Sequence, residues 1–457
     1  MVQKIGRFLI LFFIGFLPWS VALTVLGTER LGLEWMRFSK EIFLGVIITL
    51  GIIDALLKRR KIVFGSIDIF IALYVVTLLA VSLIQGASVT GMVYGLRYDA
   101  EFLIAFVALR QILGWWNISF RELAHVFIVS GGVMLFMSLL IRYVFGETIL
   151  TVLGFGDRVS VWDGSGPPPI YHGIPGAAVV RFQGMLEGPN QMAFFLLTYL
   201  GIYLTLFFRY KKYRFINSVI TLLLVFLLTQ TYSRSGLLGL MVGSSFLIFS
   251  YIVHKIRTWK QGFSWKKIAW KKIITTTVLV GFGGVLVLFQ FGPKFTEIIT
   301  RKGSTSAHFE RMYIGYVRFL EQPFGHGLAQ AGPASRSIAS VNQEPIPTAS
   351  LDGEMKKLSE FFSARNPDFI FSTEHYYIPE SWYIQQLIEG GIVGFFFFVC
   401  TGVMLLFLLK KYPILIAALL GVLVMNTFLH SFESVHTALA LFILFASLLG
   451  CGDKSST

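Results

Sequence analysis

The feature that most constrains the fold of this chain is a series of long apolar runs. A helix needs about 20 mostly apolar residues to cross the hydrocarbon core of a bilayer. Only 14% of the 457 residues are charged, against roughly 25% in soluble domains, and the mean hydropathy is +0.70. The sequence therefore predicts an all-α, polytopic membrane protein and excludes a soluble multidomain or disordered chain.

The apolar runs predict about 12 transmembrane helices in a single helical domain of residues 1–457. Polar residues at 229–235 separate the seventh and eighth helices as a hairpin. A large loop, residues 292–381, lies between the ninth and tenth and is long enough for helices of its own; a second outside segment covers 146–189. The predicted spans are roughly 8–26, 42–57, 67–85, 92–113, 123–145, 190–208, 215–231, 235–253, 273–291, 382–409, 413–429 and 435–450.

Lysine and arginine gather in alternate connections, and this asymmetry predicts the orientation of the chain in the membrane. Cytoplasmic loops carry an excess of both residues, so these connections and both termini should be cytoplasmic, with the large loop outside. The net charge of +14 is then explained by the orientation of the chain in the membrane. The sequence contains no contiguous basic patch that would support nucleic-acid binding. The basic positions are Lys4, Arg7, Lys58, Arg59, Arg60, Lys61, Arg121, Arg209, Lys211, Lys212, Arg214, Lys410, Lys411, Lys454 and those of residues 254–272.

Arginines also occur in short polar motifs at the opposite, outer edge of the predicted spans. A guanidinium binds phosphate oxygens through two parallel hydrogen bonds and stays charged at physiological pH. Each arginine alone could instead reach lipid headgroups or pair with a carboxylate. Several on one side favour a membrane-embedded ligand with phosphates at the headgroup level. These residues are Arg97, Arg181, Arg234, Arg311 and Arg318.

Candidate proton acceptors lie where the large loop returns to the membrane. Glu380 and His375 belong to the segment from Ser372 to Tyr383, and Glu380 stands at the start of the tenth span. A carboxylate there could equally stabilise the helix N-terminus without a catalytic role. His430 and His436 flank the last outside turn without a standard ligand spacing, so the sequence predicts no metal site.

Four segments resemble the bacterial O-antigen ligase and polymerase family of membrane glycosyltransferases, in that family's order. They surround the large loop and together cover about residues 180–395. They are Arg181-Phe-Gln-Gly…Gly-Pro-Asn190, Thr231-Tyr-Ser-Arg-Ser-Gly236, Arg311…Gln322-Pro-Phe-Gly-His-Gly-Leu328 and Glu380-Ser-Trp-Tyr…Gly-Gly-Ile-Val-Gly394.

The resemblance implies a multi-helix fold of the GT-C type and undecaprenyl-diphosphate-linked glycans as donors. It also implies that Arg181, Arg234 and Arg311 bind the donor diphosphate, and Arg97 and Arg318 are further candidates from their place at the outer edge. The sequence departs from the family at one position: ligases show a His-Asn pair where this chain has Glu380-Ser381. This departure favours a polymerase or another branch over a lipid-A-core ligase.

The combined prediction is a multi-pass protein of the bacterial inner membrane that transfers a lipid-linked glycan to an acceptor hydroxyl at the outer face. Arginines would stabilise charge on the leaving diphosphate, so neither a metal nor a cofactor is expected. The expected partners are the donor, a glycan or lipid-linked acceptor, and membrane lipids. The alternatives are a flippase or polysaccharide exporter without chemistry, and an oligosaccharyltransferase that differs only in its acceptor.

Overall fold

A computed structural model describes residues 1–156, 167–174, 177–207, 213–259, 302–335 and 378–450. Nearly all regular structure in these ranges is helical. The α-helices are α1 (Val2–Phe16), α2 (Ser20–Val25), α3 (Ser39–Lys58), α4 (Ser66–Ile84), α5 (Val89–Asp99), α6 (Glu101–Trp116), α7 (Phe120–Leu140), α8 (Pro189–Phe207), α9 (Arg214–Gln230), α10 (Arg234–Trp259), α12 (Lys302–Glu321), α15 (Trp382–Leu408), α16 (Pro413–Met425) and α17 (Val435–Gly450).

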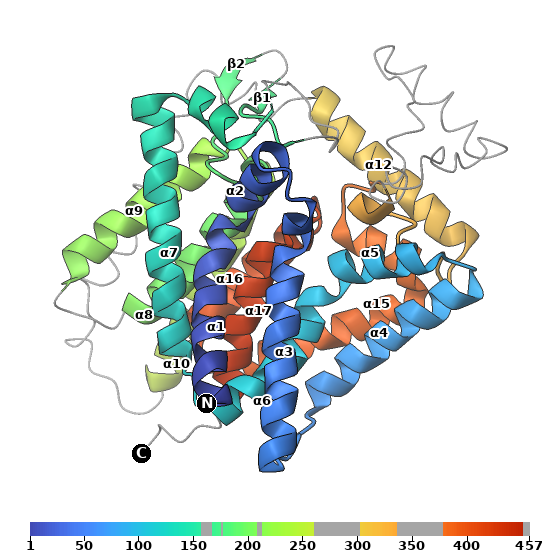
Figure 1. Cartoon of the computed structure of the whole chain (residues 1–457). Coiled ribbons are helices and arrows are strands. Elements are labelled where there is room, and N and C mark those ends of the chain that lie inside the picture. Colours follow the sequence, from blue (N-terminus) through green and yellow to red (C-terminus); the bar gives the residue numbers. More distant parts are fainter. Residues whose placement is uncertain (157–166, 175–176, 208–212, 260–301, 336–377, 451–457) are drawn as a thin grey trace.

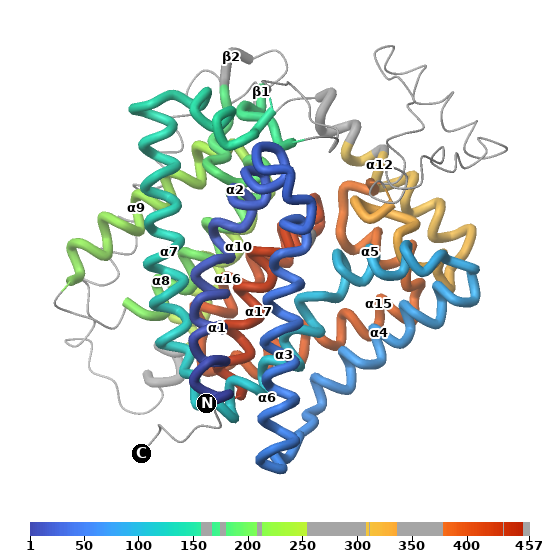
Figure 2. Tube along the Cα trace, viewed as in Figure 1, coloured from blue at the N-terminus to red at the C-terminus, as the bar shows by residue number. Residues whose placement is uncertain are grey.

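The helices form one bundle in which segments distant in sequence lie side by side. The closest associations join α17 to α6, α10 to α16 and α15 to α4, and the chain path can be followed in Figure 1 and, as a tube, in Figure 2. Glycines permit the tightest of these: a Cβ on Gly239 would lie 2.6 Å from the carbonyl oxygen of Gly421, and one on Gly243 2.7 Å from that of Ala417. The small-residue spacing in α10 is thus used for helix packing.

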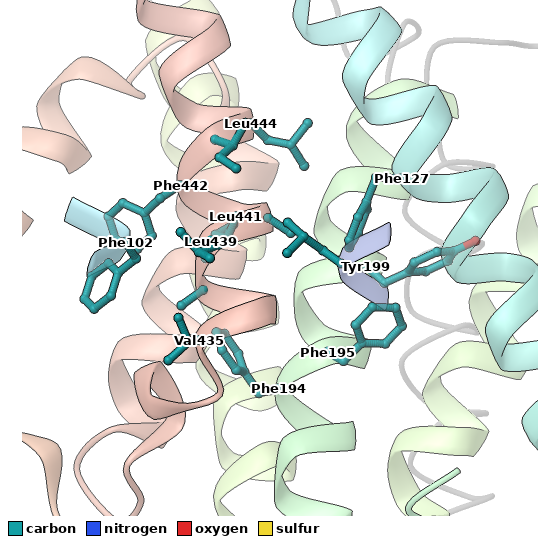
Figure 3. Close-up of a cluster of buried hydrophobic side chains, with 14 of the residues drawn as sticks. Phe102, Phe127, Phe194, Phe195, Tyr199, Val435, Leu439, Leu441, Phe442 and Leu444 are labelled. Atoms are coloured by element: carbon teal, nitrogen blue, oxygen red, sulfur yellow. The ribbon is translucent and has the colours of Figure 1, made fainter. Parts of the chain in front are cut away.

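Helix α17 is buried along almost its whole length and forms the centre of the core. Figure 3 shows its side chains between aromatic residues of α6, α7 and α8. Phe442 of α17 lies with its ring centroid 4.7 Å from that of Phe102, and the Phe127 and Phe195 rings are 5.8 Å apart. Such ring pairs add to the stabilisation that burial of large apolar side chains provides.

Within the described residues, six helical segments are long and apolar enough to cross a membrane, and the chain is thus a multi-pass membrane protein. Three shorter apolar helices, α9, α16 and α17, accompany them. The predicted total of 12 stays a prediction, because the ninth span, 273–291, lies outside the described residues. The six segments are Val2–Arg30, Ser66–Ile84, Phe120–Phe145, Pro189–Phe207, Arg234–Val253 and Trp382–Leu408.

The prediction of one continuous span at 92–113 is wrong, since the backbone leaves helical geometry at Ala100 (φ −130°, ψ −13°). Asp99, just before the break, is fully buried, and its Oδ1 accepts hydrogen bonds from the side-chain amides of Gln385 and Gln386, both 2.9 Å. These bonds to α15 satisfy one oxygen of a carboxyl whose burial would otherwise be costly.

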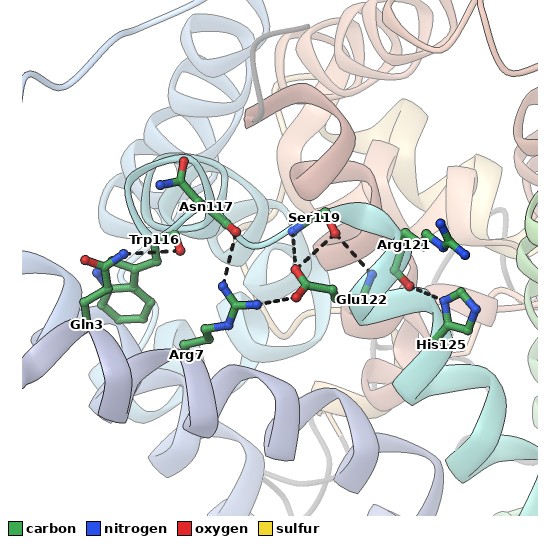
Figure 4. Close-up of polar contacts among 8 residues, drawn as sticks. All are labelled: Gln3, Arg7, Trp116, Asn117, Ser119, Arg121, Glu122 and His125. Atoms are coloured by element: carbon green, nitrogen blue, oxygen red, sulfur yellow. Dashed lines mark hydrogen bonds and ion pairs between the residues drawn. The ribbon is translucent and has the colours of Figure 1, made fainter. Parts of the chain in front are cut away.

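The basic connections of the N-terminal half meet at one end of the bundle. Arg7 of α1 forms an ion pair with Glu122 (Figure 4), and Glu122 also closes a capping box with Ser119 at the start of α7. Asp54, buried in α3, lies 2.6 Å from Lys58 Nζ. The C-terminal end of α17 lies at this end too, where a Cβ on Gly450 would be 2.2 Å from the Arg110 carbonyl oxygen. The first residues of α1 and the last of α17 therefore share one end of the bundle; we name it the basic end.

The two segments predicted as outside lie at the other end, as far as they are described. Residues 146–189 contain the short antiparallel strands β1 (Gly173–Ile174) and β2 (Ala177–Val180). The 292–381 segment contributes α12 and a turn at 322–332 that packs into a kink of α15. Gly391 forms this kink with φ +63°, and a Cβ there would lie 2.3 Å from the Phe324 backbone.

Candidate functional site

The start of α15 brings two distant parts of the chain together. Gly315 of α12 has no side chain, and a Cβ at this position would lie 2.8 Å from Pro379 and 2.7 Å from Ile384. Helix α12 therefore lies directly against the first turns of α15. The Trp382 amide that begins α15 donates to the Asn426 carbonyl oxygen at 3.0 Å, which ties this end to the segment between α16 and α17.

Glu380 is the centre of a charged cluster at this junction. One carboxylate oxygen forms an ion pair with Arg311, and the other lies 3.2 Å from Nδ1 of His308. The two partners are three residues apart on α12, so they lie on one face of that helix. Glu380 has a left-handed backbone (φ +54°), which is uncommon for a residue other than glycine and aims its side chain at α12.

The electrostatic setting keeps Glu380 ionised. Burial raises the pKa of this carboxyl, but the adjacent His308 and the charge of Arg311 outweigh it and lower the pKa to about 2. A carboxylate with so low a pKa holds cations firmly and accepts a proton poorly near neutral pH.

His430 is a further imidazole within electrostatic range of this cluster. Burial lowers its pKa to about 4, against the opposing effect of Glu380, so the ring is neutral at pH 7. Its Nε2 is buried and has no hydrogen-bond partner among the residues that the structure describes.

Aromatic rings underlie the junction and link it to α6 and α8. The Phe432 ring contacts those of Trp382, Phe102 and Phe194, with centroids 5.8, 4.9 and 6.2 Å away. Trp382, Phe102 and Phe194 follow the polar residues Glu380, Glu101 and Asn190 by one to four positions in the sequence. The starts of three helices therefore converge over one apolar layer.

Arg181 joins two of the sequence motifs. Its Nε donates to the Thr231 carbonyl oxygen at 2.9 Å, and its Nη2 donates to Asn190 Oδ1 at 2.8 Å. The side chain thus connects the end of β2 to the α9–α10 hairpin and to the start of α8. Burial together with the Arg181 charge also lowers the pKa of His172 to about 4.

The other predicted arginines occupy different places. Arg97 pairs with Glu41, donates to the Arg37 carbonyl oxygen at 2.7 Å and lies over the Phe38 ring. Arg234 begins α10, and its neighbour Ser233 caps the helix by accepting from the Gly236 amide at 3.3 Å. Arg318 lies two turns after Arg311 on α12, and its carbonyl oxygen is 2.9 Å from His326 Nε2. His375 lies outside the described residues.

Several buried polar atoms at this end have no hydrogen-bond partner among the described residues. Both carboxylate oxygens of Glu101 belong to this set, although the side chain is nearly buried at the start of α6. Buried polar groups are ordinarily satisfied, so a group of such atoms near Glu380 is typical of a site that takes polar ligands. The set also includes Trp382 Nε1, Ser431 Oγ and Thr437 Oγ1.

Sequence reasoning missed two titratable residues here. His308 belongs to no motif, and its only signal is its place one turn before Arg311. Glu187 lies inside the Arg181-to-Asn190 motif; burial raises its pKa to about 7 despite the charges of Lys40 and Arg97. In the part of the chain that the structure describes, no three His, Cys, Asp or Glu side chains form a group that could hold a metal ion.

Residues 219–399 match the family model described as O-antigen ligase. This part of the chain is therefore similar to the O-antigen ligase family. The matched region runs from α9 into α15, so it contains Arg234, Arg311, Arg318 and Glu380, while Arg97 and Arg181 precede it. The match supports a glycosyltransferase-like enzyme of the bacterial inner membrane that acts on a lipid-linked glycan and an acceptor. None of the curated proteins matches the chain.

Proposed function

We propose that this protein transfers a glycan from undecaprenyl diphosphate to an acceptor hydroxyl at the outer face of the inner membrane. The donor carries its own leaving group, so the reaction needs one cationic site for the diphosphate and one proton acceptor for the hydroxyl. The observation that carries the proposal is the cluster of Arg311, Glu380 and His308 at the start of α15.

Arg311 is the proposed contact to the diphosphate. It is 30% exposed, and Glu380 holds one of its terminal nitrogens, which leaves the rest of the planar fork able to meet phosphate oxygens bidentately. Arg181, Arg234, Arg318 and Arg97 are proposed as additional donor contacts or as supports of the pocket. Fixed guanidinium charges can stabilise the developing diphosphate, so the proposal needs no metal.

Glu380 and His375 were the proton acceptors expected from the sequence, and the contacts around Glu380 favour a refined assignment. An ionised Glu380 with a pKa of about 2 suits a residue that orients a neighbouring imidazole, as carboxylates do in hydrolase triads. We therefore propose His308 as the proton acceptor and Glu380 as its positioning residue, and His375 as the alternative acceptor.

The finer architecture is part of the same proposal. Twelve spans with both termini in the cytoplasm would place the large loop, residues 292–381, and the Glu380 cluster outside, where a translocated lipid-linked glycan is available. The separation of the basic end from the Glu380 cluster supports this orientation through the excess of Lys and Arg in cytoplasmic loops.

Reconstitution tests the proposal directly. The purified protein in liposomes receives undecaprenyl-diphosphate-linked repeat units, with and without an acceptor glycolipid, and the products are resolved by size. Lengthened lipid-linked chains would identify a polymerase, and product on the added acceptor a ligase. Release of donor to the opposite leaflet without a new glycosidic bond would contradict the proposal and identify a flippase.

A further inference from the structure

Helix α12 has two apolar faces, and only one of them packs on other residues that the structure describes. Gly315 and Phe319 face the first turns of α15, and Ile314 beside them is buried. The outward face carries Phe309, Tyr313, Tyr316 and Leu320, which are 45–57% exposed. Their spacing of four, three and four residues forms one continuous stripe along a helix.

The stripe does not end with the helix. Phe324 follows in the turn after α12 and is 72% exposed. The Pro323 carbonyl oxygen accepts a hydrogen bond from the Ile392 amide at 2.9 Å, so this turn adjoins the kink of α15. Beyond the kink, Ile392, Val393 and Phe396 are 42–58% exposed in a helix apolar enough to span the membrane.

The outward stripe of α12 thus continues the outward apolar face of a membrane-spanning helix. A contiguous exposed apolar surface marks contact with an apolar partner, and on α15 that partner is lipid. The two tyrosines match the preference of this residue for the boundary between hydrocarbon and headgroups. Arg311, on another face of α12, is turned to Glu380 and does not interrupt the stripe. Helix α12 runs along the edge of the bundle in Figure 1.

We infer that α12 is an interfacial helix whose outward stripe, Phe309 to Phe324, is immersed in the bilayer leaflet opposite the basic end. The C-terminal half of α12 lies deeper in the bilayer than its N-terminal half. The reason is that the turn at 322–325, which follows α12, contacts α15 about one-third of the way along that membrane-spanning helix. Lipid contact would fix the depth of α12 and, with it, of His308 and Arg311. The inference does not depend on the proposed function, because it concerns lipid contact alone.

Site-directed spin labelling tests this placement in the full-length protein. Cys400 and Cys451 are replaced by alanine, and single cysteines are introduced at Phe309, Tyr313, Tyr316, Leu320 and Phe324 for nitroxide labelling in liposomes. Collision rates with oxygen, which concentrates in hydrocarbon, are compared with those of a water-soluble nickel chelate. Phe396→Cys provides the lipid reference, and Glu34→Cys, at a 69% exposed side chain, the water reference.

The expected result is an excess of oxygen over nickel collisions at all five positions, with the ratio rising from Phe309 towards the value of Phe396. Higher nickel accessibility at Tyr313 and Tyr316, similar to Glu34, would show an aqueous face and overturn the inference. Low accessibility to both reagents would also overturn it, and dipolar broadening between labels would then identify a second copy as the cover. Five surface positions keep the test informative if one variant fails to fold.

Discussion

The two ends of the helix bundle differ in how their buried carboxylates are paired with cations. At the basic end each carboxylate has a cation beside it: Glu122 has Arg7, Asp54 has Lys58, and Asp68 has Arg110. At the end around Glu380, Glu101 has no hydrogen-bond partner for either oxygen among the described residues. Asp68 Oδ1 and Arg110 Nε of the basic end also lack a hydrogen-bond partner among the described residues. The difference therefore lies in the ion pairs: the three carboxylates named at the basic end each have one, whereas no described cation pairs with Glu101.

This difference distinguishes ion pairs that stabilise the fold from ion pairs that take part in ligand binding. The Arg7–Glu122 pair is reinforced by a helix cap (Figure 4) and is about 40% exposed, so it is a modest stabiliser. The Arg311–Glu380 pair joins two segments of the large loop at only 15% exposure of Glu380 and includes an imidazole. We expect substitutions at the two ends to separate stability from turnover.

The largest expected contrast is in labelling across the membrane. In a background without Cys400 and Cys451, single cysteines replace Val63 at the basic end and Leu31 at the opposite end, which are 65% and 62% exposed. A membrane-impermeant maleimide added to intact cells should modify only Leu31→Cys, because the lysine- and arginine-rich loops are cytoplasmic. Equal labelling of both, or labelling of Val63→Cys alone, would refute the orientation.

Arg311→Lys should lower turnover by roughly 10–100-fold with a normal melting temperature. Lysine keeps the charge but loses the planar fork, and a hydrogen bond to a charged group contributes about 1.5–3 kcal/mol. Arg37→Lys is the matched control, since Arg37 pairs with Glu34 on the surface of the same end. Similar losses in the two variants would mean that general charge at this end, and not the geometry of Arg311, matters.

At the basic end, Asp54→Asn should reduce stability and leave turnover per folded molecule unchanged. Asp54 is 1% exposed and accepts from Trp116 Nε1 at 3.3 Å as well as binding Lys58. Loss of its charge should destabilise the protein by about 1–3 kcal/mol, which thermal unfolding in detergent would detect. A loss of turnover without a loss of stability would place function at both ends.

The pH dependence of stability provides a smaller effect. The pKa of Glu380 is about 2 in the folded protein and 4.5 for an ordinary glutamate, so its stabilisation is complete above pH 4.5 and disappears as the pH falls through 2. The difference in melting temperature between wild type and Glu380→Gln should be constant from pH 8 to 5 and shrink below 4.5. A difference that already shrinks between pH 8 and 6 would show that Glu380 titrates near neutrality.

The sequence predicted the membrane class, the family and Arg311 and Glu380 as candidates, because apolar runs and motif order are local properties. It could not predict their pairing across 69 positions, since this depends on Gly315 letting α12 pack against α15. His308 was missed for the same reason: nothing near it in sequence marks it as a partner of Glu380. The break at Ala100 was missed because Gln385 and Gln386, which donate to Asp99 Oδ1, lie on another helix.

The same substitution at the two ends tests the central claim most directly. Glu380→Gln and Glu122→Gln each neutralise the partner of an arginine while keeping its size, and turnover per folded molecule is measured for both in liposomes with the lipid-linked donor. We predict a loss of at least about 10²-fold for Glu380→Gln, the lower range for assistance to proton transfer, and activity within about twofold of wild type for Glu122→Gln, as its exposed pair contributes little. A fully active Glu380→Gln, or equal losses in both variants, would contradict the account.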